Sequence, residues 1–550
     1  MPSKTRSSRK PRVSKSRQRD SWAWLLLLAT LLFAAVIRIR LLQMPLERDE
    51  GEFAYMGQLM LQGVPPYLLA YNMKLPGIYA AYALIMALFG QTIVGIHLGL
   101  LLINAATTVI IFLLARRLYD SYAAVFAGAS FAILSLSPSF LALASHATHF
   151  VILPALGGVL LMLKAVDSDR LSAFFWCGLL LGLAYIMKQP GAFFIVFAVV
   201  YVAWTGFRRR PIALPRCFAR CALLLLGAAI PFAATCIILV AKGVFHNFWF
   251  WTYSYAREYA SQIPPSVGLQ IALSNIPWMV GPCVFIWAFA GIGLAALLWD
   301  GKARTHGVFL VSFLVFSLLS VCPGFYFRGH YFILALPAIA LLAGVAAGSL
   351  KQLLGKFKSP ALASTIPALL AILALAHLVI GQRDVLFELS PTQACVAVYG
   401  GNPFVESLEI ARYIRAHTSK DDRIAVIGSE PQIYFYSHRR SATGYIYTYP
   451  LMEHQKYALR MQKEMIEEIE AAQPAYIVCV NIVLSWLPSP ASPRLIFSWS
   501  DKYLREYYTL VGIVDLLSPD WTEYRWDEEV EGYSPSSSGF IYILKRNSAR

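Results

Sequence analysis

The densest group of potentially reactive side chains lies just after the first apolar segment of the chain. Four carboxylates occur there within six positions, at Glu47, Asp49, Glu50 and Glu52. Like charges this close raise one another's pKa, so the cluster costs stability unless a cation or a chemical task offsets that cost. A carboxylate in such a cluster can accept the proton of an attacking hydroxyl group. The segment is therefore a candidate for general-base chemistry, and a plain solvated loop is the alternative.

Two lysines near prolines are candidates for holding an anion. Lys74 precedes an apolar run that is too short to span a membrane, so we expect a re-entrant or interfacial helix there, with the ammonium group at the depth of a lipid phosphate. Lys188 lies in the sequence MKQPG. Snorkelling of a helix-end lysine toward the membrane surface is the alternative explanation for Lys188.

Two aromatic-rich segments each carry an arginine. Arg257 lies within HNFWFWTYSYAREYASQ, and Arg328 lies beside His330 and Tyr331 in CPGFYFRGHYFILALP. The planar guanidinium group donates hydrogen bonds in pairs, which suits a phosphate. An aromatic belt at the membrane surface accounts for the rings but leaves the arginines unexplained. A carboxylate cluster with several cations is what transfer from an anionic lipid carrier needs, because the cations stabilise the phosphate that leaves.

The composition shows what must surround these residues. Of the 550 residues, 58% are hydrophobic and 14% are charged, whereas ordinary soluble domains are about 25% charged. This excludes a water-soluble protein of this size, together with the disordered and disulfide-rich classes. The sequence has no glycine-rich phosphate loop, so a cytosolic nucleotide donor is not expected. The composition predicts a polytopic α-helical membrane protein.

Eleven apolar stretches are long enough, or nearly so, to cross a bilayer as helices of about 20 residues. They cover residues 22–37, 93–115, 122–136, 150–166, 173–187, 192–206, 218–241, 280–299, 308–321, 331–350 and 361–380. The connections on one side hold many more Lys and Arg than those on the other, which places that side and the N-terminus in the cytoplasm. The first outer loop, 38–92, and everything after residue 380 then lie outside the cell membrane.

The first 20 residues form a basic tail within a chain of net charge +16. Anionic lipid headgroups are the expected partners of this tail, and no nucleic-acid partner is expected. We expect a multi-pass protein of the inner (plasma) membrane.

The pattern changes near residue 383. Helical patterns alternate there with strand-like runs, the helices at 404–417 and 453–472 and the strands at 423–428, 475–480 and 539–544. We therefore divide the chain into a basic tail, a transmembrane catalytic domain and an extracytoplasmic α/β domain, at residues 1–20, 21–382 and 383–550. Cys395 and Cys479 both lie in the last domain, where they could form a disulfide.

Several of these segments together resemble a known family. R-D-E-G-E-F-A-Y at 48–55, K-L-P-G at 74–77 and R-G-H-Y-F at 328–332 resemble the GT-C glycosyltransferases of the family 39 type. This group includes protein O-mannosyltransferases, the aminoarabinose transferases of lipid A and the Rgt galacturonosyltransferases. The resemblance covers residues 20–380, and the Asp49-Glu50 pair is its most specific element.

The resemblance implies a GT-C-like enzyme that moves a sugar from a polyprenyl-phosphate carrier to an envelope acceptor, either a glycolipid or a protein, with inversion at the anomeric carbon. By motif position, Asp49 would be the general base and Glu50 its orienting or acceptor-binding neighbour. The donor phosphate would be held by Lys74, Lys188, Arg257 and Arg328. Further site candidates are Glu52, His330 and Tyr331. No cofactor is required on this interpretation; a divalent metal on the carboxylates is compatible with it but has no support.

One position departs from the family pattern. Such enzymes commonly carry a second acidic residue at the start of the fourth span, where this chain has Thr148 in SHATHFVILP. His146 and His149 flank that position, but two neutral rings without a nearby acid make a weak metal site. We expect them to be ordinary interfacial histidines.

Two other functions remain open from the residues alone. A transporter or flippase for a lipid or a small anion would place ionisable groups at the middle of the bilayer, whereas these spans are almost free of charge. A non-catalytic envelope assembly protein would use the α/β domain to bind a partner, for example through the aromatic and arginine-rich segment GSEPQIYFYSHRRSATGYIY.

Overall fold

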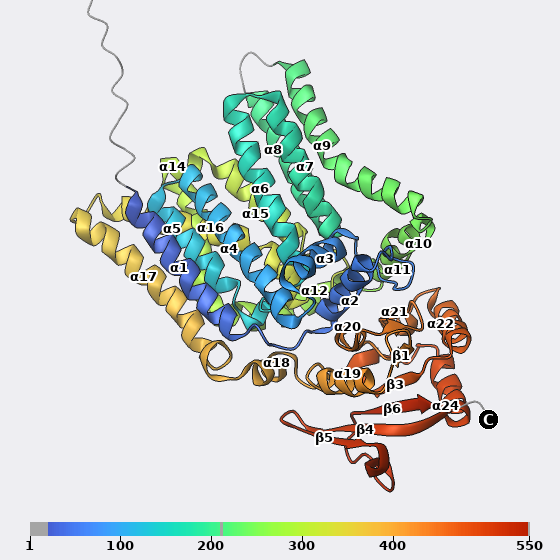
Figure 1. Ribbon diagram of the computed structural model, residues 1–550. Coiled ribbons are helices and arrows are strands. Elements are labelled where there is room, and N and C mark those ends of the chain that lie inside the picture. The colour runs from blue at the N-terminus through green and yellow to red at the C-terminus, as the bar shows by residue number, and fades with distance from the viewer. Residues whose placement is uncertain (1–19, 209–212, 548–550) are drawn as a thin grey trace, which may run out of the picture.

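The computed structural model of the protein describes residues 20–208 and 213–547. It is a bundle of long helices with a smaller domain of helices and strands at one end (Figure 1). The helix α1 (Ser21–Arg40) begins at the other end, where α8 (Ala192–Arg208) ends and α9 (Leu214–Ala241) begins (Figure 1). We call the end that meets the smaller domain the site end. Apart from Asp20, the predicted basic tail lies outside the described residues.

Within the described residues, eight helical segments are long and apolar enough to cross a membrane. They are α1 (Ser21–Arg40), α4 (Ile93–Leu118), α6 (Ala147–Ser168), α8 (Ala192–Arg208), α9 (Leu214–Ala241), the run formed by α12 (Pro265–Val280) and α13 (Val284–Ala295), α16 (Leu336–Leu354) and α17 (Pro360–Gly381). Four shorter apolar helices accompany them: α3 (Gly77–Phe89), α5 (Ser121–Leu134), α7 (Leu171–Met187) and α15 (Gly307–Leu319). Each of the eleven predicted stretches is helical, which confirms the predicted multi-pass fold.

Small residues let these helices approach closely. A Cβ atom on Gly178 of α7 would lie 1.9 Å from the carbonyl oxygen of Leu224 in α9, and one on Gly182 would lie 2.3 Å from that of Ala228. Glycine at such points is the usual way for helices to pack in a membrane, where the lipid supplies no hydrophobic drive for association. Side-chain caps fix several helix starts, since Thr92 and Asp120 each accept a hydrogen bond from a backbone N–H of the first turn.

Short elements gather at the site end between the long helices. They are α2 (Arg48–Leu61), α10 (Phe245–Trp249), a π-helical turn at Phe250–Tyr255, α11 (Ala256–Ala260) and a 3₁₀ turn at Gly329–Leu334; α14 (Gly301–Thr305) belongs to the other end. The helix α3 lies where a re-entrant or interfacial helix was expected after Lys74. These elements bring the predicted site residues to one region.

The α/β domain follows α17 and contains one six-stranded mixed sheet. The strand order is β2-β1-β3-β6-β4-β5; β1 pairs in parallel with β2 and β3, and the other pairs are antiparallel. The strands are β1 (Arg423–Ile427), β2 (Arg440–Ser441), β3 (Tyr476–Asn481), β4 (Tyr508–Ser518), β5 (Trp521–Trp526) and β6 (Phe540–Arg546). The helices are α18 (Pro391–Tyr399), α19 (Glu406–Ala416), α20 (Gln432–Ser437), α21 (Tyr449–Met452), α22 (Ala458–Ala472), α23 (Val483–Trp486) and α24 (Leu495–Tyr507).

The predicted helices and strands of this domain are confirmed in α19, α22, β1, β3 and β6. Cys395 and Cys479 are both free thiols, so the disulfide considered from the sequence is not present. The domain packs against the start of α2, with α20 and α21 nearest to the bundle (Figure 1).

Candidate active site

The first turn of α2 is built by two of the four clustered carboxylates. Glu47 is the N-cap and accepts a hydrogen bond of 3.0 Å from the backbone N–H of Glu50, whose side chain accepts one of 3.2 Å from the N–H of Glu47. This reciprocal capping box satisfies two backbone donors that a helix start would otherwise leave unpaired. Acidic side chains there also interact favourably with the helix dipole. Part of the acidic cluster is therefore explained by helix formation.

Glu50 points away from the cavities of the site end. Its Oε1 lies 3.1 Å from Nε2 of His97 and accepts a hydrogen bond of 2.5 Å from the backbone N–H of Ser145. The side chain is fully buried and lines neither cavity described below. Its contacts tie α2 to α4 and to the segment before α6.

Asp49 faces the opposite way and meets Lys74. The Nζ of Lys74 lies 3.4 Å from Oδ1 of Asp49, so the expected convergence of these two residues is confirmed. Burial alone would raise the pKa of Asp49, but Lys74 and the further charges of His146, Lys188 and Arg328 hold that pKa at about 2. The carboxylate is thus ionised and partly open to a cavity.

Glu52 is the second carboxylate beside Lys74. Its Oε2 accepts a hydrogen bond of 2.6 Å from Asn72 and lies 3.9 Å from Nζ of Lys74, while Oε1 accepts one of 3.0 Å from Tyr79. Burial raises the pKa of Glu52 to about 8, against the opposing effect of Lys74. Glu52 therefore fixes the loop that carries Lys74 and does not reach either cavity.

Two further cations lie nearby without an acidic partner. In the described part of the chain, neither Lys188 nor Arg328 forms an ion pair. Lys188, between α7 and α8, rests 4.3 Å from the ring centre of Tyr331, and Arg328 rests 5.3 Å from that of Tyr326. Burial, with help from Lys74, lowers the pKa of Lys188 to about 7. A buried cation without an acidic partner, such as Lys188, is costly, so this arrangement favours binding of an anion.

Two cavities adjoin at a wall formed by Met73, Lys74, Lys188, Tyr259 and Tyr331. The lining of the first is mainly apolar and comprises Met73, Lys74, Lys188, Gln189, Pro190, Ala256, Tyr259, Ala260, Ser320, Val321, Pro323, Gly324, Tyr331 and Leu334. The second is more polar and is lined by Asp49, Asn72, Met73, Lys74, Lys188, Tyr255, Tyr259, Arg328, His330, Tyr331, Tyr447, Tyr449, Pro450 and Glu453. Among the five shared residues, Lys74 and Lys188 place two ammonium groups where the cavities join.

Solved structures similar to this chain include archaeal oligosaccharyltransferases and ArnT. ArnT from Cupriavidus metallidurans, solved with undecaprenyl phosphate bound, aligns with a TM-score of 0.55 and 16% identity over 96% of this chain and 98% of that chain. The chain has the GT-C fold. The resemblance inferred from the sequence is thereby confirmed at the level of the fold.

Two further comparisons support the GT-C fold. The archaeal oligosaccharyltransferase AglB from Archaeoglobus fulgidus, in complex with an inhibitory peptide and dolichol phosphate, aligns with a TM-score of 0.54 and 11% identity over 93% of this chain and 75% of that chain. The sequence model of the family described as dolichyl-phosphate-mannose-protein mannosyltransferase matches residues 74–255. No curated protein sequence matches the chain.

The GT-C fold brings together most of the residues predicted for the site. Asp49, Lys74, Lys188 and Arg328 converge, and His330 and Tyr331 line the same polar cavity. Arg257 does not join them, because it is exposed on α11 and lines neither cavity.

The histidines near α6 differ from the prediction. His146 and His149 are almost completely buried, so they are not ordinary interfacial side chains. The ring of His146 stacks on that of His330 at 4.3 Å, and Nδ1 of His146 lies 3.9 Å from Oδ2 of Asp49. Acids therefore do lie near His146, because its Nδ1 is also 3.5 Å from Oε1 of Glu47. The ring that stacks on it, His330, comes from a segment far along the chain. Thr148, at the position where an acid was expected, is buried in α6.

Asp49, His146 and His330 also bring one potential metal-ligating atom each to within 4.8 Å of one another. Nitrogen and carboxylate ligands of this kind suit a transition metal. The two imidazole planes are only 14° apart, however, so their in-plane lone pairs run side by side and do not converge on one point. Lys74 also holds the same carboxylate. The imidazole ring of His146 or His330 would have to rotate before these two residues and Asp49 could coordinate a single metal ion.

The α/β domain contributes residues to the site that were not among the predicted site residues. Tyr447, Tyr449 and Glu453 line the polar cavity, and Glu453 accepts hydrogen bonds of 2.5 Å from Tyr255 and 3.0 Å from Gln262. The signal is the segment GYIYTYPLME, whose first four residues end the aromatic and arginine-rich segment considered above for partner binding.

Proposed function

We propose that this protein transfers a sugar from a polyprenyl-phosphate carrier to an acceptor hydroxyl group. One observation carries the proposal: an ionised carboxylate, Asp49, and two cations with no acidic partner among the described residues, the buried Lys188 and the half-buried Arg328, line one cavity. Such a site supplies a base for the attacking hydroxyl group and positive charge for the phosphate that leaves. A transporter reading finds no comparable support, since these groups gather at one end of the bundle.

The donor phosphate is proposed to lie between Lys74, Lys188 and Arg328. The mainly apolar cavity adjoins this point and suits the first part of a prenyl chain. ArnT and AglB were solved with undecaprenyl phosphate and dolichol phosphate, respectively, which supports a carrier of the same class here. Arg257 has no place in this proposal, because it is exposed away from both cavities.

The proposed reaction is a single displacement with inversion. Asp49 accepts the proton of the acceptor O–H as the oxygen attacks the anomeric carbon, and the bond from that carbon to the phosphate oxygen breaks. The electron pair stays on the phosphate, where the lysines and Arg328 stabilise it. A pKa of about 2 makes Asp49 a weak base in the empty site. A bound phosphate shares the same cations and so raises that pKa toward the useful range.

The acceptor is proposed to enter the polar cavity from the side walled by Tyr447, Tyr449 and Glu453. An envelope glycolipid or protein is the proposed acceptor class. We also propose the topology predicted from the sequence, with the N-terminus in the cytoplasm and residues 383–550 as an extracytoplasmic domain in the inner (plasma) membrane.

The decisive experiment compares envelope glycolipids and glycoproteins by mass spectrometry in cells with and without the gene. Loss of one sugar in the deletion strain should be restored by the wild-type chain. Asp49→Asn should lower the rate of its restoration about 10²–10⁴-fold, the usual contribution of a general base. Asp167→Asn, which alters an exposed carboxylate at the other end of the bundle, is the matched control and should restore the sugar fully.

Full restoration by Asp49→Asn contradicts the assignment of the base. Movement of undecaprenyl phosphate across sealed liposomes by the purified protein, with no sugar change in the deletion strain, contradicts the proposed function as a whole.

A further inference from the structure

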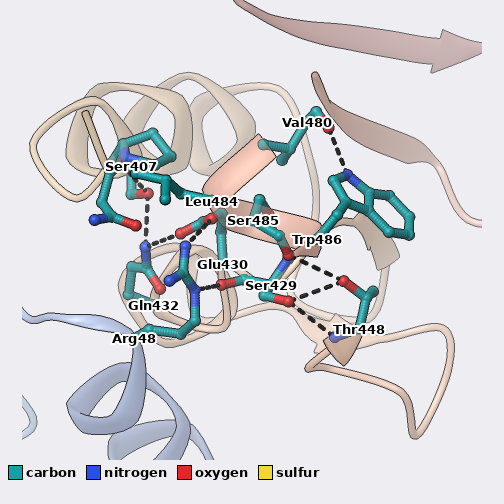
Figure 2. Close-up of polar contacts among 12 residues, drawn as sticks. Arg48, Ser407, Ser429, Glu430, Gln432, Thr448, Val480, Leu484, Ser485 and Trp486 are labelled. Atoms are coloured by element: carbon teal, nitrogen blue, oxygen red, sulfur yellow. Dashed lines mark hydrogen bonds and ion pairs between the residues drawn. The ribbon is translucent and has the colours of Figure 1, made fainter. Parts of the chain in front are cut away.

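The start of α2 is bonded to the α/β domain through Arg48, the residue next to Asp49. Its Nη2 donates to Oε1 of Glu430 at 2.8 Å, its Nε donates to the carbonyl oxygen of Ser429 at 2.5 Å, and its Nη1 donates to the hydroxyl of Tyr449 at 2.8 Å. Arg48 is only 6% exposed and Glu430 is completely buried. Figure 2 shows Arg48 reaching from α2 into this group of domain residues. The ion pair is therefore shielded from water and fixed in one geometry.

The other side of this ion pair is held within the domain. Oε2 of Glu430 accepts a hydrogen bond of 2.8 Å from Gln432, whose amide nitrogen also lies 3.0 Å from Oγ of Ser407 (Figure 2). The backbone N–H of Ser429 donates to Ser485, and Oγ of Ser429 lies 2.8 Å from Oγ1 of Thr448. The carboxylate that meets Arg48 thus has little freedom to move.

The helix α2 itself also sits directly on this part of the domain. A Cβ atom on Gly51 would lie 2.7 Å from the backbone nitrogen of Gln432. Farther along α2, the hydroxyl of Tyr55 accepts a hydrogen bond of 2.8 Å from the N–H of Ser441. The position of the first turn of α2 is therefore set by the domain as well as by the bundle.

We propose that Glu430 is a positioning residue of the transferase site: by fixing Arg48 it sets the orientation of Asp49, and through Arg48 it also sets Tyr449 on the wall of the polar cavity. This inference rests on the proposed function. It makes the α/β domain a part of the catalytic apparatus, because a side chain from that domain controls the placement of the base and of one acceptor-facing ring. A shift of about 1 Å in such a group can cost roughly 10²-fold in rate.

The test uses the full-length purified protein and the envelope product found in the deletion experiment. Glu430→Gln alone leaves a buried arginine without its counter-charge, so it lowers stability as well as turnover. The double variant Arg48→Met/Glu430→Met removes both charges and keeps similar volume, which usually leaves stability unchanged or higher. We expect this double variant to unfold at or above the wild-type temperature, to bind undecaprenyl phosphate as the wild type does, and to turn over about 10²-fold more slowly.

The control is Tyr55→Phe, which removes a hydrogen bond between the same helix and the same domain but lies away from Asp49. It should lower the unfolding temperature while turnover stays within about threefold of the wild type. A purely structural role for Arg48 and Glu430 predicts a different pattern. Turnover would then fall only together with stability, in the double variant and in Tyr55→Phe alike.

A folded double variant with turnover within about threefold of the wild type overturns the inference. If the double variant does not fold, Arg48→Lys decides, because it keeps the charge but loses the fork that reaches Ser429, Glu430 and Tyr449 at once. Slower turnover with unchanged affinity for undecaprenyl phosphate supports the inference, and unchanged turnover overturns it. Absence of any product from the wild type would instead count against the proposed function, so the two failures are distinguishable.

Discussion

The two ends of the helix bundle differ in whether their cationic side chains are paired with acids. At the end opposite the site, cations meet acids in partly or largely exposed ion pairs, such as Arg116 with Asp20 and Arg117 with Asp167. At the site end, Lys188 and Arg328 are held against aromatic rings and have no acidic partner in the described residues. Exposed pairs contribute little to stability, whereas an unpaired buried charge costs a great deal.

The difference indicates which charges serve folding and topology and which serve a ligand. Among the described residues neither Lys188 nor Arg328 has an acid to pair with, so their positions are best explained by an anion that binds to both. The same logic separates Glu50, whose bonds to His97 and Ser145 are internal, from Asp49, which opens to the cavity.

The strongest test of this contrast is Lys188→Met. Removing one charge-assisted contact should weaken binding of undecaprenyl phosphate by about 10–100-fold, since hydrogen bonds to charged groups contribute about 1.5–3 kcal/mol. The same change removes a buried unpaired ammonium group, so the ligand-free protein should unfold at a higher temperature. Binding is measured by titration and stability by thermal unfolding.

Lys302→Met at the opposite end is the matched control for that experiment. Lys302 is half exposed, and its Nζ lies 4.0 Å from Oδ2 of Asp120, so it is an ion-paired lysine outside the site. It should change neither quantity appreciably. Equal effects of the two substitutions on binding would remove the contrast between the ends.

The pH dependence of binding also tests whether Lys188 binds an anion. The folded-state pKa of Lys188 is lowered to about 7, so its charge is lost as pH rises through that value. A bound phosphate favours the charged form, so binding takes up a proton above pH 7. Affinity for undecaprenyl phosphate should fall by up to about tenfold per pH unit there. Titrations at pH 6.5 to 9 check this, and a slope that persists in Lys188→Met would assign the effect to another group.

Glu52→Gln tests the carboxylate that anchors Lys74. The folded-state pKa of Glu52 is raised to about 8, so its contribution to stability is complete below the unfolded pKa and is lost as pH rises through 8. Wild-type stability should therefore fall relative to Glu52→Gln by up to about 1.4 kcal/mol per pH unit between pH 5 and 8. Denaturant unfolding of both proteins at several pH values measures the difference, and parallel curves would contradict it.

The smallest effect is expected at the opposite end. Asp167→Asn removes the partner of Arg117, but the Asp167 side chain is 72% exposed. Exposed pairs typically contribute about 0–1 kcal/mol. Thermal unfolding should shift very little and binding of undecaprenyl phosphate should not change. A loss as large as that of Lys188→Met would show that the two ends are not distinct in the way proposed.

Much of the fold was predictable because a bilayer imposes a simple length and composition on each span. All eleven predicted stretches are helices, and short α3 lies where a spanning helix was excluded. In the α/β domain, β1, β3 and β6 were found from their apolar runs, but β4 and β5 were missed. The residues of β5, such as Trp521 and Arg525, do not alternate between buried and exposed. The strand therefore lacks the two-residue periodicity of hydrophobic side chains that predicts a strand.

The site could be predicted where its residues lie close together in the sequence. It could not be predicted where the fold brings residues together from distant segments. Asp49 and Lys74 share one loop, so their meeting followed from local reasoning. His146 finds its stacking partner in His330, and Tyr449 reaches the cavity from the α/β domain. Neither contact can be inferred from the spacing of these residues along the sequence. Glu50 was assigned a role beside Asp49, yet successive residues of a helix point about 100° apart, and its bonds are internal.

The close approach of Gly51 to Gln432 has a consequence for biosynthesis. The first turn of α2 leaves the ribosome hundreds of residues before the segment against which it must rest, and the bundle helices are translated in between. The first turn of α2 can reach its final position only after the segment around Gln432 has been synthesised. A nascent chain that ends before Gln432 therefore lacks the surface against which the first turn of α2 rests.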